Sequence, residues 1–408
     1  MLKLKWLIIA ALTIGMFGRC SKTPTTPDTT LPRELTSAEK SIVESDNKFG
    51  LKLFRQINTE EGAKNIFISP LSVSMALGMT LNGAHGSTYD AMRATLEYEG
   101  LTEEQINKSY HDLMELLLGL DPEVVLQIAN SIWYRNTYTF RETFINTNKQ
   151  YFDAEVAGLN FDDPASVNVI NGWVNQSTNG KITEIIDSIH PATVMFLINA
   201  IYFKGTWTYQ FEEKDTYDGY FTLPDNSQQN CKMMRQANEF NYFNDEQIQA
   251  VELPYGDGLF SMILMLPKQD VDIEALIKNL DQTAWDSWLG KLTKQNGTVH
   301  LPRFKLEYEI KMNDALTALG MGIAFSDLAD FTSMYEPGGL FISQVKHKSF
   351  VEVNEEGTEA SAVTIVEIRE TMATDEFNLV VNRPFIFAIR ENHSGSILFI
   401  GKIVNPNS

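Results

Sequence analysis

Residues 354–385 read NEEGTEASAVTIVEIRETMATDEFNLVVNRPF, and this stretch decides how the rest of the chain is interpreted. Considered as a strand, residues 358–369 divide into two faces, because successive side chains of a strand point to opposite sides. One face carries no charge and begins with small residues: Thr358, Ala360, Ala362, Thr364, Val366 and Ile368. The other face carries three charged side chains, Glu359, Glu367 and Arg369. The alternation predicts a strand with one buried and one more exposed face.

Two features distinguish this segment from an ordinary strand of the native sheet, which is the simpler interpretation. Gly357 stands immediately before it, where a chain can pivot through dihedrals that other residues avoid. The polar stretch 369–376 contains no glycine or Asn-Gly turn signal before the next strand begins at Phe377. Small residues at the start of the uncharged face suit a segment that slides into an already packed sheet, because large ones would raise the cost of opening it.

Composition excludes several classes of function. The chain has 408 residues, 43% of them hydrophobic, so it is long enough to bury a large core. Its net charge of −20 and the lack of a Lys/Arg cluster argue against nucleic acid as a partner. The two cysteines, Cys20 and Cys231, lie in no CxxC or Cys/His pattern. We therefore expect no internal disulfide, no metal site and no cofactor.

The N-terminus has the pattern of an export signal. Residues 1–19 place Lys3 and Lys5 before a short apolar run, which is typical of a secretory signal peptide. Residues 20–36 are rich in Thr and Pro and are predicted to form a tether, and residues 37–408 to form a single domain. Cys20 at the junction resembles the acylated cysteine of a bacterial lipoprotein; the alternative is an ordinary cleaved signal followed by an incidental cysteine. Both interpretations predict an exported protein, secreted or lipid-anchored at the bacterial cell envelope (outer membrane or surface), with membrane contact only through the lipid.

Hydrophobic periodicity predicts mixed α+β architecture. Residues 37–57 are predicted to form a helix with Ser37 as its N-cap, and residues 70–82 a helix capped by Ser69 and followed by Gly83. Strands are predicted at 125–135, at 194–207, on both sides of the turn 256–258, at 300–310, and in a closing hairpin that turns at 392–395.

No catalytic motif is present. The chain has no GxSxG elbow, no phosphate-binding loop and no GxGxxG after a strand. Its six histidines stand in no recognisable nucleophile context: His85, His111, His190, His300, His347 and His393. We therefore expect that the protein is not an enzyme.

Several motifs spread along the chain together resemble the serpin family. The hinge Asn354–Ala360 matches that of the family almost residue for residue. The other matching segments are Asn65–Ser72, Asn171–Ile182, Asn199–Trp207, Asn382–Phe385 and Leu398–Lys402. The resemblance spans about residues 37–406 and implies three β-sheets, about nine helices and a metastable native state with an exposed reactive-centre loop at about residues 355–376.

The resemblance also implies roles for individual residues. The hinge would comprise Glu355, Glu356, Gly357, Thr358, Glu359, Ala360, Ser361 and Ala362. Counting from Glu355 gives Thr371–Met372 as the reactive bond, with Arg369, Glu370 and Ala373 as alternative positions. Ser69, Ser72, Asn199 and His347 fall at the family's shutter beneath the central sheet. Trp207, Arg303 and Glu355 fall at the breach, where the strand first inserts, and we expect an ion pair between Arg303 and Glu355 there.

The implied function is suicide-substrate inhibition of endopeptidases, acting as a monomer. A protease would cleave the loop, form an acyl-enzyme, and be trapped when residues 358–371 insert as a strand in the central sheet. Thr371 and Met372 suit elastase-like and subtilisin-like serine proteases, and papain-like cysteine proteases are a further class. Arg369 offers a bond to trypsin-like proteases. The alternative is a non-inhibitory serpin that acts as a binding or chaperone-like protein.

Overall fold

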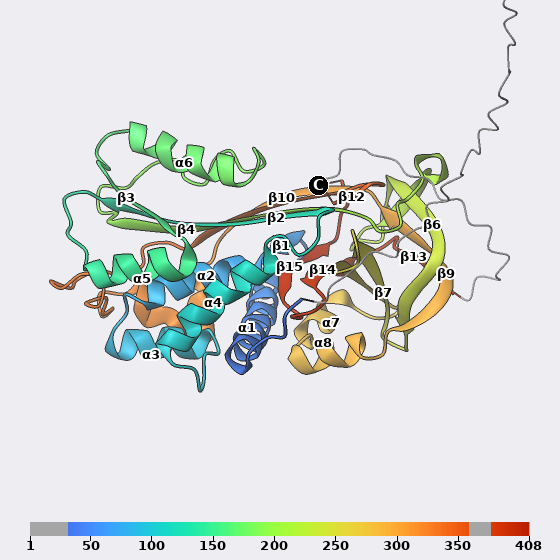
Figure 1. Ribbon diagram of the computed structural model, residues 1–408. Coiled ribbons are helices and arrows are strands. Elements are labelled where there is room, and N and C mark those ends of the chain that lie inside the picture. The colour runs from blue at the N-terminus through green and yellow to red at the C-terminus, as the bar shows by residue number, and fades with distance from the viewer. Residues whose placement is uncertain (1–31, 359–376, 408) are drawn as a thin grey trace, which may run out of the picture. The chain divides into compact units, whose positions relative to one another are not determined.

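The computed structural model describes residues 32–358 and 377–407 (Figure 1). Within these residues there are nine α-helices, and their bounds are α1 (Ser37–Glu61), α2 (Pro70–Leu81), α3 (Gly86–Thr95), α4 (Glu103–Leu117), α5 (Glu142–Phe152), α6 (Ala165–Ser177), α7 (Ile273–Lys278), α8 (Gln282–Leu289) and α9 (Asn313–Leu316). Helices and strands are mixed along the chain, so the predicted α+β class is confirmed.

The first two helices begin at residues whose side chains satisfy free backbone N–H groups. The N-cap of α1 is Thr36, not Ser37 as predicted, and its hydroxyl accepts from the N–H of Glu39 while the Glu39 carboxylate accepts from the N–H of Thr36. This reciprocal capping box needs the spacing Thr-x-x-Glu, which starts one residue before Ser37. The predicted Ser69 cap and Pro70 start of α2 are confirmed.

One sheet has six strands in the order β10, β11, β12, β4, β2, β3. Their bounds are β10 (Phe304–Lys311), β11 (Lys346–Val353), β12 (Gly357–Thr358), β4 (Met195–Thr206), β2 (Val124–Arg135) and β3 (Glu155–Leu159). Helix α6 lies over one face of this sheet, and α2, α4 and α5 lie on the other side (Figure 1). The short strand β12 therefore stands between two long strands, β11 and β4.

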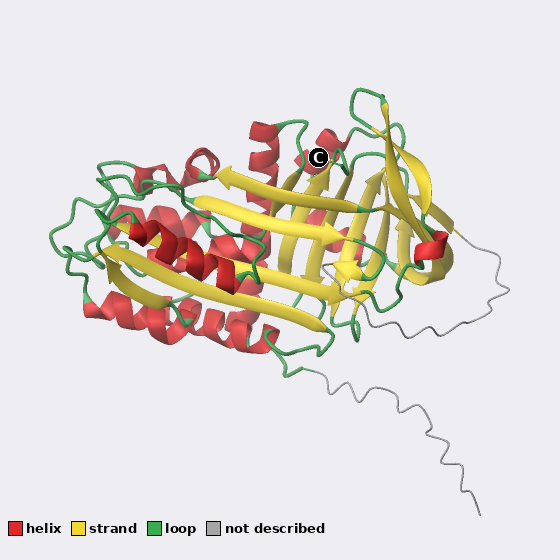
Figure 2. Cartoon of the chain, turned by 90° about the horizontal axis from the view of Figure 1, so that it is seen from above, coloured by secondary structure: helices red, strands yellow, loops and turns green. Residues whose placement is uncertain are grey.

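The second sheet has nine strands. Eight follow the order β1, β15, β14, β8, β7, β6, β9, β13, and β5 also pairs with β6. Their bounds are β1 (Ile66–Ile68), β5 (Tyr217–Thr222), β6 (Gln228–Asn244), β7 (Ile248–Tyr255), β8 (Phe260–Pro267), β9 (Thr293–Pro302), β13 (Phe377–Val380), β14 (Phe385–Glu391) and β15 (Ile397–Ile403). The long strand β6 pairs with both β7 and β9, so two groups of strands join into one hydrogen-bonded sheet. In Figure 2 its strands run across the direction of the six-stranded sheet.

The predicted strand at 300–310 is two strands that belong to different sheets. β9 ends at Pro302 in the nine-stranded sheet, and β10 begins at Phe304 in the six-stranded sheet. Between them, the backbone N–H of Arg303 donates to the carbonyl of Lys232 at 2.9 Å. Arg303 therefore lies at the corner where the chain passes from one sheet to the other.

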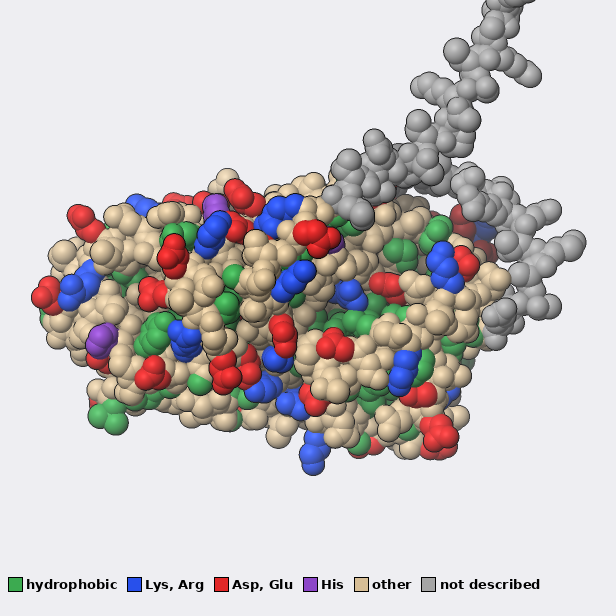
Figure 3. Space-filling model, turned by 60° about the horizontal axis from the view of Figure 1, so that its bottom comes forward, with side chains coloured by type: hydrophobic (Ala, Val, Ile, Leu, Met, Phe, Trp, Pro, Cys, Tyr) green, Lys and Arg blue, Asp and Glu red, His purple; other side chains and the backbone are tan. Residues whose placement is uncertain are grey.

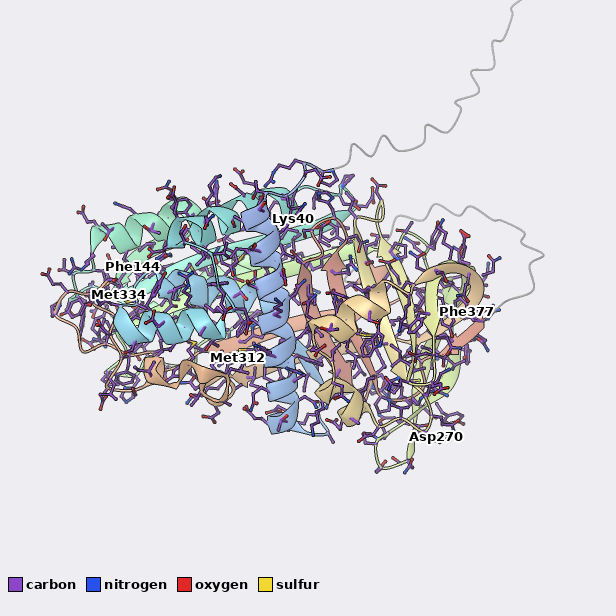
Figure 4. All side chains as sticks on the ribbon, turned by 90° about the horizontal axis from the view of Figure 1, so that it is seen from below. Lys40, Phe144, Asp270, Met312, Met334 and Phe377 are labelled. Carbon is purple, nitrogen blue, oxygen red and sulfur yellow. The ribbon has the colours of Figure 1, made fainter. Side chains whose placement is uncertain are left out.

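The core runs between the sheets and the helices. Phe67 of β1 stacks between Phe387 and Phe399, with ring centroids 5.5 and 5.1 Å away. Phe377 lies among the side chains of the strand-rich end, where the described chain resumes (Figure 4). Cys231 is buried and forms no disulfide. Across residues 32–358 and 377–407, no helix is both long and apolar enough to cross a membrane.

Candidate strand-insertion site

The hinge residues Gly357 and Thr358 pair with strands on both sides. Thr358 lies opposite Val353 of β11 and opposite Gly205 of β4, and both pairings are antiparallel. Thr358 is only 2% exposed, so its side chain faces the core. Glu359, Ala360, Ser361 and Ala362, the remaining predicted hinge residues, lie outside the described residues.

Only glycine fits at position 357. A Cβ atom there would lie 2.0 Å from the carbonyl oxygen of Gly205, a backbone atom that cannot move away alone. Just before it, the side-chain oxygen of Asn354 accepts from the backbone N–H groups of Glu356 and Gly357, at 3.0 and 3.2 Å. This Asx-type turn reverses the chain from β11 into β12, and the missing side chain lets β12 approach β4.

The ion pair expected between Arg303 and Glu355 is present. Nε of Arg303 donates to Oε1 of Glu355 at 2.7 Å, and a second guanidinium nitrogen lies 2.6 Å from the same oxygen. The Glu355 side chain is 5% exposed, whereas that of Arg303 is 41% exposed. The hydroxyl of Thr216 also donates to Oε1 at 2.5 Å. Two residues from different segments thus hold one buried carboxylate at the start of the hinge.

Trp207 joins the same group of contacts. Its indole N–H donates to the carbonyl of Asn354 at 3.0 Å, and its backbone N–H donates to the carbonyl of Glu356 at 2.9 Å. Its ring stacks on that of Tyr255 with centroids 4.4 Å apart. The structure therefore brings all three predicted breach residues together around the hinge.

Three of the four predicted shutter residues form one hydrogen-bonded group. The Ser69 hydroxyl donates to the carbonyl of Leu398 at 2.7 Å and accepts from the backbone N–H of Ser72 at 3.2 Å. The backbone N–H of Ser69 donates to Nε2 of His347 at 3.2 Å. Burial lowers the pKa of His347 to about 4, so the ring is neutral and its Nε2 is free to accept.

Asn199, the fourth predicted shutter residue, makes different contacts. Its side-chain amide donates to Oδ1 of Asn130 on the neighbouring strand β2 at 2.8 Å, and lies 3.7 Å from Sδ of Met75. Among the hydrogen bonds of the described residues, none joins Asn199 to Ser69, Ser72 or His347. Met75 belongs to α2, so this contact links Asn199 to that helix.

Sequence reasoning missed three residues of this site. Tyr255 ends strand β7 and reaches the hinge from the other sheet, and Thr216 binds Glu355 from a loop. Asn130 is the partner of Asn199. No local pattern marks any of them, because each is defined by a contact between segments far apart in the sequence. The predicted turn 256–258, directly after Tyr255, is the closest feature that the sequence indicates.

The predicted reactive bond lies outside the described residues, as do Cys20 and the alternatives Arg369, Glu370 and Ala373 around Thr371–Met372. The described chain ends on either side of this segment in two different sheets. β12 belongs to the six-stranded sheet, and β13 pairs in parallel with β9 of the nine-stranded sheet. Phe377 at the start of β13 stacks on Tyr242 with centroids 3.8 Å apart. The described residues on the two sides of positions 359–376 are therefore held in two different sheets.

Other features of the described surface do not belong to this site. A cavity of about 1230 Å³ is lined mainly by α1, residues 267–274 and residues 382–384, and no hinge, shutter or breach residue lines it. His111, Asp112 and Glu115 on α4 bring possible metal ligands within 4.8 Å of one another, but Asp112 forms an ion pair with Lys108. On the face in Figure 3, Lys and Arg side chains are interspersed with Asp and Glu.

Comparisons with protein families, with related proteins and with solved structures all indicate the same family. The family model described as "Serpin (serine protease inhibitor)" matches residues 44–406. The chain is 36% identical to the leukocyte elastase inhibitor of Sus scrofa over 89% of this chain and 98% of that protein, and 35% identical to the neuroserpin of Mus musculus over 90% and 92%. The crystal structure of tengpin, a thermophilic serpin in its native state, matches with a TM-score of 0.84 and 33% identity over 92% of this chain and 96% of that chain. Human thyroxine-binding globulin, solved with its ligand, matches with a TM-score of 0.83 and 28% identity over 91% and 100%.

Proposed function

The chain belongs to the serpin family, and we propose that it is a suicide-substrate inhibitor of endopeptidases. Cleavage near Thr371–Met372 would form an acyl-enzyme, and insertion of residues 358–371 into the six-stranded sheet would trap the protease. The observation that carries this proposal is the pairing of β12 with both β11 and β4, since it provides the first step of a strand between them.

The register of β12 defines the surroundings of an inserted strand. If the strand continued past Thr358 in the same register, Ala360 would lie between Val351 and Phe203. Ala362 would then lie between Ser349 and Ile201. These four neighbours are all buried, so a small side chain is needed at each of the two positions. Thr364 then lies between His347 and Asn199, at the shutter. The two alanines of the uncharged face thus coincide with positions at which both neighbours are buried.

The energetics also favour insertion. Residues 358–371, extended at about 3.3 Å per residue, reach roughly 46 Å, which would carry an attached protease from one end of the sheet towards the other. About a dozen new ladder hydrogen bonds at roughly 1 kcal/mol each give a driving force on the order of 10 kcal/mol, to which burial of the uncharged face adds.

The second candidate function is that of a non-inhibitory serpin. The structural similarity to thyroxine-binding globulin, whose crystal structure contains its ligand, shows that this fold also occurs in a binding protein. The residues of the insertion face argue for inhibition, because Thr358, Ala360, Ala362 and Thr364 include no proline and no charge. We therefore favour inhibition of elastase-like and subtilisin-like proteases, with trypsin-like cleavage at Arg369 and papain-like enzymes as further targets.

The decisive experiment mixes the purified protein with elastase, subtilisin, trypsin and papain. An inhibitor gives a covalent complex that survives denaturing electrophoresis, together with a released C-terminal peptide whose mass identifies the cleaved bond. We expect that peptide to begin at Met372. Cleavage by all four enzymes without any complex would refute inhibition of these classes and favour the binding-protein alternative.

A matched pair of variants tests insertion itself. In Ala362→Glu a carboxylate would have to enter the core between Ser349 and Ile201, so the complex should be lost and the protein should become a substrate. In Ser361→Glu the same group lies on the opposite face, beside Phe350, where Lys181 and Lys305 also lie. This control should still form the complex. Equal behaviour of the two variants would contradict the proposed register.

For the N-terminus we propose export to the bacterial cell envelope, with Cys20 as the lipid-bearing residue. The support is the charged and apolar pattern of residues 1–19 followed directly by Cys20. Metabolic labelling with a radioactive fatty acid should label the wild type and leave Cys20→Ser unlabelled. An unlabelled wild type would leave a secreted protein without an anchor.

A further inference from the structure

The side chain of Tyr255 occupies a fixed position beneath the hinge. Its ring is fully buried, stacks on Trp207, and meets the ring of Phe203 edge-on with centroids 5.1 Å apart. Gly205 makes room for it, because a Cβ atom there would lie 2.8 Å from Cδ1 of Tyr255. Both Phe203 and Gly205 belong to β4, so the Tyr255 ring is packed against the strand that flanks the insertion path.

The hydroxyl of this ring reaches the first inserted residue. The Tyr255 hydroxyl lies 2.7 Å from Oγ1 of Thr358. Both groups are buried, and within the described chain neither forms a hydrogen bond with any other residue. One hydroxyl therefore donates to the other, and moving Thr358 out of this position would leave the buried Tyr255 hydroxyl without this partner.

We propose that Tyr255 is a positioning residue that seats Thr358 and thereby fixes the register in which the reactive-centre segment inserts. This inference rests on the proposed inhibitory function. A strand that slips by one residue turns every side chain to the opposite face. Slippage here would direct Glu359 and Glu367 into the core in place of the uncharged face. Tyr255 belongs to β7 of the other sheet, so its hydroxyl links Thr358 to an element outside the six-stranded sheet.

The test uses hydroxyl removal on each side of the contact. Tyr255→Phe and Thr358→Val each remove one oxygen with little change in volume, and the double variant removes both. Tyr308→Phe is the matched control, since the Tyr308 hydroxyl is also buried in the six-stranded sheet but has no hydrogen-bond partner among the described residues. Two readouts are measured: hydrogen exchange of the hinge amides without protease, and the stoichiometry of inhibition with the protease that forms the complex.

In both single variants the hinge amides should exchange hydrogen about five-fold faster, which is the factor expected for the loss of one net hydrogen bond. The exchange rate of the double variant should be no higher than that of either single variant. When Thr358 is held less firmly, insertion of the strand should be slower, and hydrolysis of the acyl-enzyme then competes with trapping of the protease. The number of inhibitor molecules cleaved per complex formed should therefore also rise about five-fold. The control should change neither readout.

Two outcomes would overturn the inference. Unchanged hinge exchange in Tyr255→Phe would show that the hydroxyl does not hold Thr358. Faster exchange with an unchanged stoichiometry would show that the contact does not guide insertion. If the wild type forms no complex with any protease, the inhibitory function fails, while the exchange data still decide whether Tyr255 seats the hinge.

Discussion

Replacing Asp46 by asparagine should change how the stability of the native state depends on pH. Asp46 lies in α1 and is buried; the Tyr110 hydroxyl donates to its Oδ1 at 2.7 Å, while Oδ2 has no hydrogen-bond partner in the described chain. Tyr98, the other titratable group nearby, is hydrogen-bonded to Tyr110, and burial raises the pKa of both tyrosines, so both are neutral. Burial raises the pKa of Asp46 from 3.8 to about 7.

His347 acts in the opposite direction. Its pKa is lowered from 6.5 to about 4 by burial, so the unfolded chain takes up a proton at this site in a range where the folded chain does not. Between about pH 4 and 6.5 the folded chain holds one extra proton at Asp46 and the unfolded chain holds one extra proton at His347. The two contributions to the slope of stability against pH have opposite signs and nearly cancel.

Each single variant, Asp46→Asn or His347→Gln, should show the pH dependence of stability that the remaining residue causes. Asp46→Asn leaves the histidine, so stability should fall by about 1.4 kcal/mol per pH unit below pH 6.5, or about 2 kcal/mol between pH 6.5 and 5.0. His347→Gln leaves the aspartate, whose raised pKa gives stability that is present at low pH and lost as pH rises through 7. Stability of this variant should therefore rise by about 2 kcal/mol from pH 6.5 to 5.0.

Urea unfolding of the wild type and both variants at pH 5.0, 5.8, 6.5 and 7.5 measures these slopes. Differences from the wild type isolate the two residues, since the contributions of all other groups are common to the three proteins. Curves for Asp46→Asn that remain parallel to those of the wild type across this range would refute the assignment of a neutral, buried carboxyl group to the folded state.

Two further substitutions test local contacts. Gly357→Ala forces a methyl group against the Gly205 carbonyl and should lower the stability of the native state by about 1–3 kcal/mol in thermal unfolding. The control Gly172→Ala, which has open space around it, should be neutral or stabilising. Equal effects of the two substitutions would contradict the close approach of Gly357 to Gly205. Glu274→Ala removes the carboxylate 3.0 Å from the fully buried ammonium of Lys402 and should cost about 2 kcal/mol in urea unfolding, and an unchanged midpoint would show that the pair contributes nothing.

Local patterns in the sequence correctly predicted elements whose ends are marked by a cap or a turn. Ser69 with Pro70 fixed the start of α2, and the turn 256–258 separated β7 from β8. The break at Arg303 was missed, although the apolar positions shift by one residue there, from Val299 and Leu301 to Phe304 and Leu306, because the two halves of the run belong to different sheets. Periodicity reports which side chains are buried and not what covers them.

The parts of the insertion site that lie within short sequence motifs could be predicted. The hinge around Gly357 and the Arg303–Glu355 pair were found because the motif resemblance assigns positions residue by residue. The contact between Tyr255 and Thr358 was not found, because two hydroxyl-bearing residues in distant segments give no signal until the fold brings them within hydrogen-bonding distance. The same holds for Asn130 and Asn199, whose pairing depends on the register of β2 and β4.

The anchoring of the reactive-centre segment in two sheets has a consequence for timing. If residues 358–371 inserted while the chain was intact, only residues 372–376 would remain to return to Phe377, and these span at most about 18 Å against the roughly 46 Å just travelled. β13 lies on the side of β12 away from the far end of β4 (Figure 1), so it would have to leave β9 and Phe377 would have to leave Tyr242. Under the proposed mechanism, one unbroken peptide bond would therefore keep the molecule in its less stable form, and because its cleavage could not be reversed after insertion, each molecule would act only once.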